Sequence, residues 1–374
     1  MPDSLTTRIK QLALEKGAVK AGIASVEALT GPPTADASHV LPGARSVVSF
    51  LAVEPEGAVI KYLSKEDPSE YRDHFYENIQ TLGRVGLSVA EALRREGFRA
   101  EALSPNGVYE HGSNVVKGLI PAFSHRYAAV AAGLGAIGWS GNVMTPEYGS
   151  RVYLSSVITD AELEPDRPLE DNPCDRCNIC LKACPGVFMS WDESVSFTLG
   201  GRTITHAKKG LHARCAISCG AFTGLSVDRK WSSFVPSRYA IPEDDGELLR
   251  LLAHLAAENG RRSAENPELP SFIRLSMDVP GYDRPGILAR SRHDTIVACG
   301  NCAIVCFETL QKRAKALKLL LHSGVVVEDE EGRERVVSAE EARRYQAEYV
   351  QPSSPVAENP PTQHVAFPPK QAAD

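Results

Sequence analysis

The sequence has no long hydrophobic stretch, no export signal and no excess of basic residues. No apolar run approaches the roughly 20 residues of a membrane-spanning helix, and the N-terminal residues contain neither an apolar signal core nor a twin-arginine motif. The net charge of −6 gives the chain no overall basic field that would attract nucleic acid or anionic lipid. These absences predict a cytoplasmic protein without a membrane or nucleic-acid partner.

Cysteine, by contrast, is concentrated in short runs. One run reads Cys174-x2-Cys177-x2-Cys180-x3-Cys184 and is followed directly by Pro185. In bacterial ferredoxins this run wraps three thiolates around one [4Fe–4S] cluster, and its fourth cysteine ligates a second cluster. A disulfide framework is not favoured, because disulfides are typical of oxidising compartments and small secreted scaffolds. The spacing therefore predicts an iron–sulfur protein.

A second, incomplete run supplies a partner for the first. Cys299-x2-Cys302-x3-Cys306 repeats the last three positions, and Ile296 stands where the first cysteine would be. If Cys306 points outward, it completes the cluster held by the first three cysteines of the first run. The second cluster then lacks one thiolate.

The missing thiolate must come from the two remaining cysteines. Cys215 and Cys219 stand four residues apart in HARCAISCGAF, so on a helix they share a face and geometry alone does not separate them. We expect one of them to complete the second cluster with Cys184, Cys299 and Cys302, and the other to pack as a small buried side chain. A zinc site would use four of the nine cysteines and leave five without a role.

Helical and strand patterns alternate over the N-terminal part of the chain. SVVSFLAV at 46–53 is typical of a buried strand, a helix interrupted at Gly83 and Gly86 is expected from about 70 to 96, and 150–159 again resembles a strand. This alternation predicts an α/β domain. The composition divides the chain into an α/β domain at 1–164, a double-cluster domain at 165–324 with an insertion at about 228–298, a hairpin and helix at 325–350, and a proline-rich extended tail at 351–374.

A glycine-rich turn lies in the first of these domains. Gly133-Leu-Gly135-Ala-Ile-Gly138 matches the glycine pattern of dinucleotide-binding folds. That pattern follows a strand and opens a helix, whereas AAVAA, directly before it, is the end of a predicted helix. We therefore interpret it as a turn where the backbone passes close to a flat or bulky group.

Polar side chains near this turn are further candidates for the site. His125 and Arg126 begin the preceding helix, where they could equally form a solvated helix start. Tyr148 and Arg151, in TPEYGSR, could equally pack at a strand edge. Tyr109 lies on a polar loop, where functional groups concentrate. The spacing of these residues does not by itself assign them a role.

The stretch SHRYAAVAAGLGAIGWSGNVMTPEYGSRVYLSSVITDAEL, followed by NPCDRCNICLKACP, resembles the epoxyqueuosine reductase family and the related reductive dehalogenases. The resemblance extends over about residues 5–310. It implies an α/β (α+β) architecture, with a nitroreductase-like, cobalamin-binding domain at 1–164 followed by a ferredoxin-like domain with two [4Fe–4S] clusters. The family's lone cysteine follows a basic residue, as Cys215 follows Arg214, which favours Cys215 over Cys219 as the eighth ligand.

The resemblance also implies roles for particular residues. Cobalamin would bind base-off, and no Asp-x-His-x-x-Gly sequence is present to supply an axial histidine. His125 and Tyr109 are the candidate catalytic residues. The residues expected to contact cobalamin are Arg126, Gly133, Gly135, Gly138, Tyr148 and Arg151. The expected cluster ligands are Cys174, Cys177, Cys180 and Cys306 for one cluster and Cys184, Cys215, Cys299 and Cys302 for the other.

Three departures from the family pattern bear on the substrate. GLIPAFSHR lacks the Asp and Glu that the family carries before the glycine turn, and His125 stands near the Glu position. Phe307 replaces the family's proline after the last cysteine, and 325–374 shows no helical repeats of the kind associated with tRNA binding. These departures predict reduction of an electrophilic small molecule, with electrons from a ferredoxin- or flavodoxin-type donor. The alternatives are a non-catalytic, ferredoxin-type electron carrier that docks a partner enzyme, and a tRNA epoxyqueuosine reductase.

Overall fold

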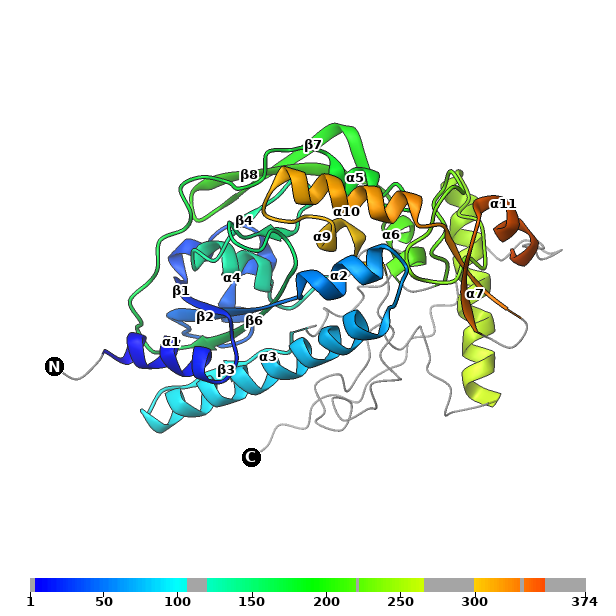
Figure 1. Cartoon of the computed structure of the whole chain (residues 1–374). Coiled ribbons are helices and arrows are strands. Elements are labelled where there is room, and N and C mark those ends of the chain that lie inside the picture. Colours follow the sequence, from blue (N-terminus) through cyan, green and yellow to red (C-terminus); the bar gives the residue numbers. More distant parts are fainter. Residues whose placement is uncertain (1–3, 106–119, 220–221, 266–298, 330–332, 347–374) are drawn as a thin grey trace.

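The computed structural model describes residues 4–105, 120–219, 222–265, 299–329 and 333–346 (Figure 1). Tyr109, Ile296 and the proline-rich tail lie outside the described residues, so the expectations that concern them stay predictions. No helix in the described part is both long enough and apolar enough to cross a membrane.

A four-stranded sheet in the order β1-β2-β6-β3 organises the N-terminal part. β2 (Ser46–Val53) lies between β1 (Lys20–Ser25) and β6 (Val152–Thr159), and the short β3 (Ala100–Ala102) pairs with the C-terminal end of β6. All three pairings are antiparallel, so this is a mixed helix and sheet fold of the α+β kind. Among the described strands, β3 pairs with only the C-terminal end of β6.

Two helices cover one face of the sheet. α1 (Leu5–Glu15) and α3 (Ser69–Arg95) pack there over a core that includes Phe50. The expected interruptions of the long helix are wrong, since α3 runs without a break through Gly83 and Gly86. A Cβ at Gly86 would lie 3.5 Å from Phe50, so the glycine lets the helix backbone approach the sheet closely.

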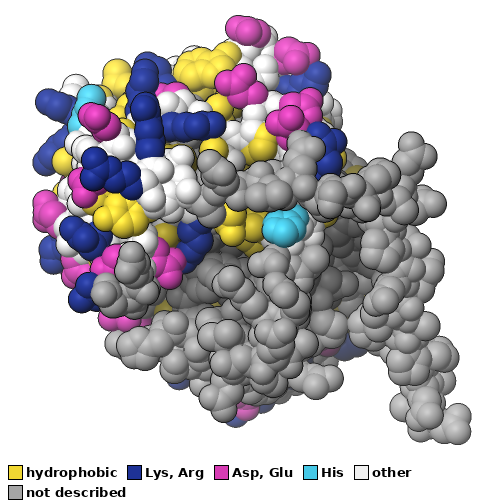
Figure 2. Space-filling model, turned by 90° about the vertical axis from the view of Figure 1, so that its right-hand side faces the viewer, with side chains coloured by type: hydrophobic (Ala, Val, Ile, Leu, Met, Phe, Trp, Pro, Cys, Tyr) yellow, Lys and Arg dark blue, Asp and Glu magenta, His cyan; other side chains and the backbone are white. Residues whose placement is uncertain are grey.

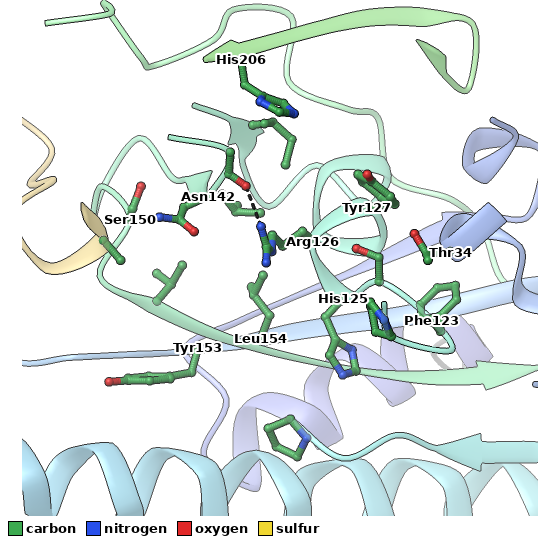
Figure 3. A pocket seen from close by; sticks show the side chains of 18 of the residues that line it. Thr34, Phe123, His125, Arg126, Tyr127, Asn142, Ser150, Tyr153, Leu154 and His206 are labelled. Atoms are coloured by element: carbon green, nitrogen blue, oxygen red, sulfur yellow. Dashed lines mark hydrogen bonds between the residues drawn. The ribbon is translucent and has the colours of Figure 1, made fainter. Parts of the chain in front are cut away.

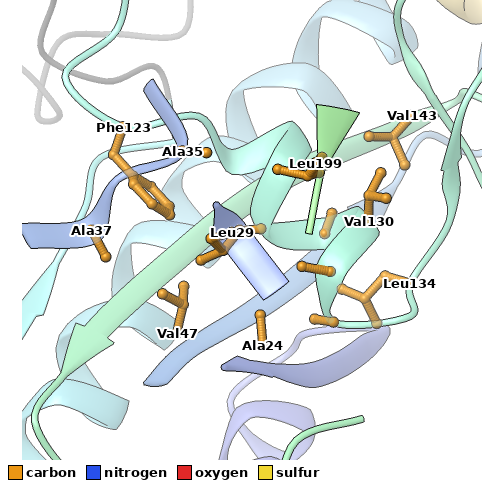
Figure 4. Close-up of a cluster of buried hydrophobic side chains, with 14 of the residues drawn as sticks. Ala24, Leu29, Ala35, Ala37, Val47, Phe123, Val130, Leu134, Val143 and Leu199 are labelled. Carbon is orange, nitrogen blue, oxygen red and sulfur yellow. The ribbon is translucent and has the colours of Figure 1, made fainter. Parts of the chain in front are cut away.

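α4 (His125–Ala131) covers the opposite face, where a second core forms (Figure 4). In this core Val47 of the sheet and Val130 of α4 meet Leu199, which comes from a hairpin far along the chain. Three short 3₁₀ helices between β1 and β2 also pack here; they are η1 (Glu27–Leu29), η2 (Pro33–Ala35) and η3 (Ala37–His39).

The hairpin that reaches this core was not predicted. It consists of β7 (Met189–Leu199) and β8 (Arg202–Lys209), and its turn returns to the N-terminal part, where the Gly200 amide donates to the Thr30 carbonyl at 2.8 Å. The Ala207 amide also donates to the Trp139 carbonyl at 2.9 Å. Residues on both sides of the boundary expected near 165 therefore pack together.

Two single-turn helices carry the paired cysteine runs. α5 (Ile179–Lys182) and α9 (Asn301–Ile304) each follow a left-handed residue, Asn178 with φ 59° and Gly300 with φ 57°. These two residues occupy the same position in the two runs. The helices lie together, and the buried Asn301 side chain donates to the Ala183 carbonyl at 3.3 Å. The two runs thus fold alike and face each other.

The remaining elements surround this region. α2 (Glu56–Leu63) and α10 (Leu310–His322) share a buried cluster with α5 and α9, around Tyr62 and Phe307. The others are β4 (Ala136–Ile137), β5 (Val143–Met144), α6 (His212–Cys219), α7 (Asp245–Glu265), β9 (Val325–Glu328), β10 (Glu334–Val337), α11 (Ala339–Ala342) and η5 (Arg343–Tyr345). Figure 2 shows the side of the molecule that carries α7, where acidic and basic side chains intermingle over the described surface.

The expected C-terminal hairpin is confirmed, since β9 and β10 pair antiparallel. The expected cap is confirmed too, because the Ser338 hydroxyl accepts from the Glu341 amide at 3.1 Å. The helix that it caps was expected to reach about residue 349. It ends at Ala342 and continues only as the short η5.

Gly149 joins the sheet to the cysteine region and yields a test of this packing. It has φ 61°, and a Cβ added there would lie 1.9 Å from the Cys306 carbonyl oxygen. We expect Gly149→Ala to lower the free energy of unfolding by roughly 2–4 kcal/mol, because the two backbones must separate. Gly83→Ala is the matched control: nothing lies within 4 Å of its added Cβ, and alanine should stabilise α3 by up to about 1 kcal/mol. Anaerobic urea unfolding measures both, and equal effects would contradict the close approach.

Candidate functional site

The first cysteine group surrounds a cavity. Cys174, Cys177, Cys180 and Cys306 all line it, together with Trp139 and other residues of the glycine turn. Local hydrogen bonds shape the loop that carries the first two cysteines. The Asn172 side chain accepts from the Cys174 amide at 2.9 Å, and the Asp175 side chain accepts from the Cys177 amide at 3.2 Å.

Hydrogen-bond donors point at the sulfur atoms of this group. The Trp139 amide donates to the Cys174 sulfur at 3.2 Å, and Nη1 of the buried Arg313 donates to the Cys177 sulfur at 3.3 Å. Arg313 also pairs with Asp175 at 2.6 Å, which fixes the guanidinium in place. N–H donors aimed at sulfur stabilise a thiolate and tune the potential of a cluster that it holds.

A second group gathers around α9 and α6. Cys302 lies in α9, and Cys299 directly precedes the cap of that helix. Cys184 follows α5, and the Cys219 thiol contacts the Cys299 thiol. Here too N–H donors face sulfur: the Phe188 amide lies 3.3 Å from the Cys184 sulfur, and the Asn142 side chain lies 3.4 Å from the Cys302 sulfur. Electrostatic interactions also link Cys184 with Cys302.

The last cysteine of each run therefore lies with the other run. Cys306 lies with the first group and Cys184 with the second, as the ferredoxin-type exchange requires. Burial raises the pKa of Cys306 to about 11 and that of Cys184 to about 12. A bound metal would have to supply the charge that keeps these thiols ionised, with release of their protons.

The donor set fits iron–sulfur clusters. Each group brings several thiols together with N–H donors beside their sulfur atoms, and the first group lines a cavity. Among the described residues, no three His, Cys, Asp or Glu side chains are placed to hold a single metal ion.

Both Cys215 and Cys219 reach the second group. Their sulfur atoms lie 3.4 Å apart on successive turns of α6. The expectation that the spare cysteine is buried is wrong for Cys219, which is exposed, whereas Cys215 is partly buried. The structure therefore brings five thiols together, one more than a [4Fe–4S] cluster would use.

A pocket of about 490 Å³ lies beside the second group (Figure 3). α4, β6, the turn at 141–143 and the β7–β8 hairpin form its walls, and its volume is typical of a site for a small molecule or part of a cofactor. Asn142 lines the pocket while its side chain touches the Cys302 sulfur. His212, at the start of α6, and Ala303, next to Cys302, also line it. One side chain thus separates the pocket from the second group.

His125 lines the pocket, but both of its ring nitrogens are occupied. Nε2 lies 2.8 Å from the Ser104 carbonyl and must donate to it, so Nδ1 accepts from the Ser156 hydroxyl at 3.0 Å. Burial lowers the pKa of His125 to about 4, so the ring is neutral at pH 7. In this arrangement His125 ties α4 to β6 and to the chain after β3 and has no proton free for a ligand.

The other expected cofactor residues lie in different places. Arg126 lines the pocket and donates to the Gly141 carbonyl at 2.9 Å. Tyr148 and Arg151 do not line it: Arg151 is buried between the sheet and the chain after Cys306, where its guanidinium stacks 4.4 Å from the Phe307 ring. This contact is consistent with the strand-edge alternative for Arg151.

The three glycines of the turn do not line the pocket, although Ile137 between them does. A Cβ added at Gly133 would lie 2.3 Å from the Arg167 carbonyl oxygen, and one added at Gly135 would lie 2.7 Å from the Met144 carbonyl oxygen. Gly138 lies against Cys174, whose sulfur would be 3.5 Å from an added Cβ. We expected a flat or bulky group beside this turn. Among the described residues, its close neighbours are backbone at Gly133 and Gly135 and the Cys174 side chain at Gly138.

Several pocket residues gave no sequence signal. His206 and Lys209 lie on the hairpin that was not predicted, and Asn142 stands alone in a turn. Tyr153 lines the pocket and donates to the buried Glu54 at 2.9 Å. Burial raises the pKa of Glu54 to about 7, so this pair is a protonatable group at the pocket wall.

The chain is similar to oxidoreductases, and specifically to epoxyqueuosine reductases. No protein-family model matches it. The enzyme of Bacillus cereus is 41% identical over 151 residues, which are 39% of this chain and 36% of that relative. The enzyme of Gloeobacter violaceus is 29% identical over 211 residues, which are 48% of this chain and 59% of that relative. The enzyme of Listeria monocytogenes is 54% identical over 52 residues, 14% of its length. The resemblance to this family is thus confirmed, and the chain spans less than two thirds of each of these curated relatives.

Solved structures of the same kinds of protein are also similar. An epoxyqueuosine reductase with a tRNA-Tyr stem loop is 22% identical, with a TM-score of 0.37, and 59% of this chain and 58% of that one are covered. The reductive dehalogenase NpRdhA is 19% identical, with a TM-score of 0.41, and the match covers 56% of this chain and 28% of that one. The expectation that nucleic acid is not a partner stays a prediction.

The choice between the two cysteines of α6 can be made with two variants. We expect Cys215→Ser to lower the iron content and alter the EPR signal of the second cluster, because Cys215 is the partly buried member and matches the family pattern. Cys219→Ser, the matched control one helical turn away, should leave both signals unchanged. Iron analysis and EPR of the reduced proteins give the answer, and the opposite pattern assigns the ligand to Cys219.

Proposed function

We propose that the protein is an iron–sulfur reductase in which two [4Fe–4S] clusters deliver electrons to a cobalamin-containing pocket, where an electrophilic small molecule is reduced. The observation that carries this proposal is the contact of Asn142 with both the pocket and the Cys302 sulfur. A cluster held by Cys302 would stand one side chain away from a ligand in the pocket.

The cysteine groups indicate which residues would hold each cluster. Cys174, Cys177, Cys180 and Cys306 would hold one, and Cys184, Cys215, Cys299 and Cys302 would hold the other. Clusters supply single electrons, and cobalamin, when bound base-off, supplies the metal centre for the reduction. Asp175 and Arg176 are exposed beside the first group, which makes that side the expected docking site for a ferredoxin- or flavodoxin-type donor.

The chain's own side chains would position the ligand and supply a proton. Arg126 would contact the cofactor or substrate, and His125 would hold the pocket wall through its hydrogen bonds to Ser104 and Ser156. Tyr109 remains a proposed catalytic residue, and Gly133, Gly135, Gly138, Tyr148 and Arg151 would support the cofactor region from behind the pocket wall. The family's reducing chemistry and the free thiols are consistent with a cytoplasmic location.

The rival proposal is a non-catalytic, ferredoxin-type carrier. A carrier needs a cluster domain and a docking surface but no cavity beside its second cluster. The pocket of about 490 Å³ against Asn142 therefore favours the enzyme.

Metal analysis with two variants tests the cluster assignment. Anaerobically purified protein should contain about eight iron atoms and as many sulfides, four for each cube. Cys177→Ala should damage one cluster and Cys302→Ala the other, because the two cysteines belong to different groups. Mössbauer and EPR spectra report the surviving cluster in each variant. One stoichiometric zinc ion without sulfide would refute the proposal.

Added cobalamin separates the enzyme from the carrier. We expect it to bind with the absorption spectrum of the base-off form, and the EPR spectrum of the Co(II) form should show no nitrogen coupling from an axial imidazole. Cysteine-to-alanine variants of the first group serve as a control, since none of these cysteines lines the described pocket. A protein that holds both clusters and does not bind cobalamin would be a carrier.

A further inference from the structure

One side of the pocket gathers basic side chains. The described residues that line the pocket include Arg126, Lys209, His206 and His212, and none of them is an Asp or a Glu. No ion pair of Arg126 or Lys209 occurs among the described residues. A cavity that carries unpaired positive charge and no carboxylate has the charge pattern of an anion site.

Three of these basic side chains converge on Gly141. Arg126 donates to its carbonyl at 2.9 Å, and a Cβ added there would lie 2.9 Å from Nζ of Lys209 and 3.9 Å from Cγ of His206. Gly141 has φ 79°, a conformation that favours glycine, and it leaves the space that the Lys209 amine uses. In Figure 3 Arg126 extends from α4 into the pocket between Leu154 and His206.

Arg126, Lys209 and His206 repel one another, and the nearby thiols of Cys302 and Cys215 offset only part of this effect on Lys209. Burial and then the positive charge of Arg126 lower the pKa of Lys209. Burial also lowers the pKa of His206, with Lys209 and Arg126 adding to the effect. The His206 Nδ1 is already occupied by the Ala207 carbonyl at 2.8 Å. An anion placed here would relieve the repulsion and receive charge-assisted hydrogen bonds from Arg126 and Lys209, and from Nε2 of His206 once its presence has protonated that ring.

We propose that the side of the pocket formed by Arg126, Lys209 and His206 binds an anionic group, a phosphate, phosphodiester or carboxylate. Apolar side chains also line the pocket, among them Phe123, Val152 and Leu154, so a ligand with an apolar body and an anionic end would fit it. The inference rests on the proposed function and deepens it. The anion belongs either to the substrate or to the phosphodiester of the cobalamin tail.

Phenyl phosphate is a suitable probe, because it combines a ring with a phosphate, and phenol is its neutral counterpart. Isothermal titration of the cluster-loaded protein should show binding that Lys209→Gln and Arg126→Gln each weaken about tenfold or more. Phenol binding should not change, and Lys209→Arg should restore most of the affinity for phenyl phosphate.

Lys208→Gln is the matched control for the lysine. It makes the same change in charge one residue earlier on β8, where the exposed Lys208 pairs with Glu193 at 2.9 Å outside the pocket. Its affinity for phenyl phosphate should equal that of the unmodified protein. Equal affinities of Lys209→Gln, Arg126→Gln and Lys208→Gln proteins for phenyl phosphate, or no binding at all, would overturn the proposal.

Cobalamin and cobinamide, which lacks the nucleotide tail, distinguish the two sources of the anion. If the site holds the tail, Lys209→Gln weakens binding of cobalamin but not of cobinamide, and cobalamin displaces phenyl phosphate. If it holds the substrate, both corrinoids bind the variant normally and phenyl phosphate binds in their presence. The protein could hold neither iron nor cobalamin and still lose phenyl phosphate binding in the Lys209→Gln variant. That result would support the anion site and refute the proposed function.

Discussion

The exchange of cysteines between the two short helices is the constraint on which the rest of the structure depends. α5 and α9 can each offer a thiol to the other's group only if they lie face to face, and the buried Asn301 side chain holds them there through the Ala183 carbonyl. The sheet joins the same point, because the Ser150 amide donates to the Cys306 carbonyl at 2.8 Å. Local distortion of this junction would therefore move both cysteine groups and the sheet together.

The β7–β8 hairpin connects this junction to the pocket and supplies part of the pocket wall. It starts beside Cys184, crosses to the N-terminal core with Leu199, and returns to place His206 and Lys209 over the pocket. Lys209 faces a cavity whose other walls come from α4 and β6. The pocket therefore takes its walls from both halves of the chain, and the hairpin connects them.

What the sequence predicted was mostly local. The cysteine runs, the buried strands at 46–53 and 150–159 and the Ser338 cap depend on neighbouring residues, and all can be recognised in the sequence. The hairpin was missed because its strands expose polar residues on both faces over most of their length, which hides the alternation of a half-buried strand. Gly83 and Gly86 suggested breaks that helix packing overrides.

The site depends on long-range contacts that spacing cannot reveal. Lys209 is distant in the sequence from Arg126 and Gly141, and their convergence follows from the path of the hairpin.

The exchange of Cys184 and Cys306 between the two groups can be tested by anomalous diffraction at the iron edge from anaerobically grown crystals. We expect two iron clusters, one bonded to Cys306 with the first three cysteines of its partner run, and one bonded to Cys184, Cys299 and Cys302. A single cluster bonded to all four cysteines of the first run would contradict the exchange.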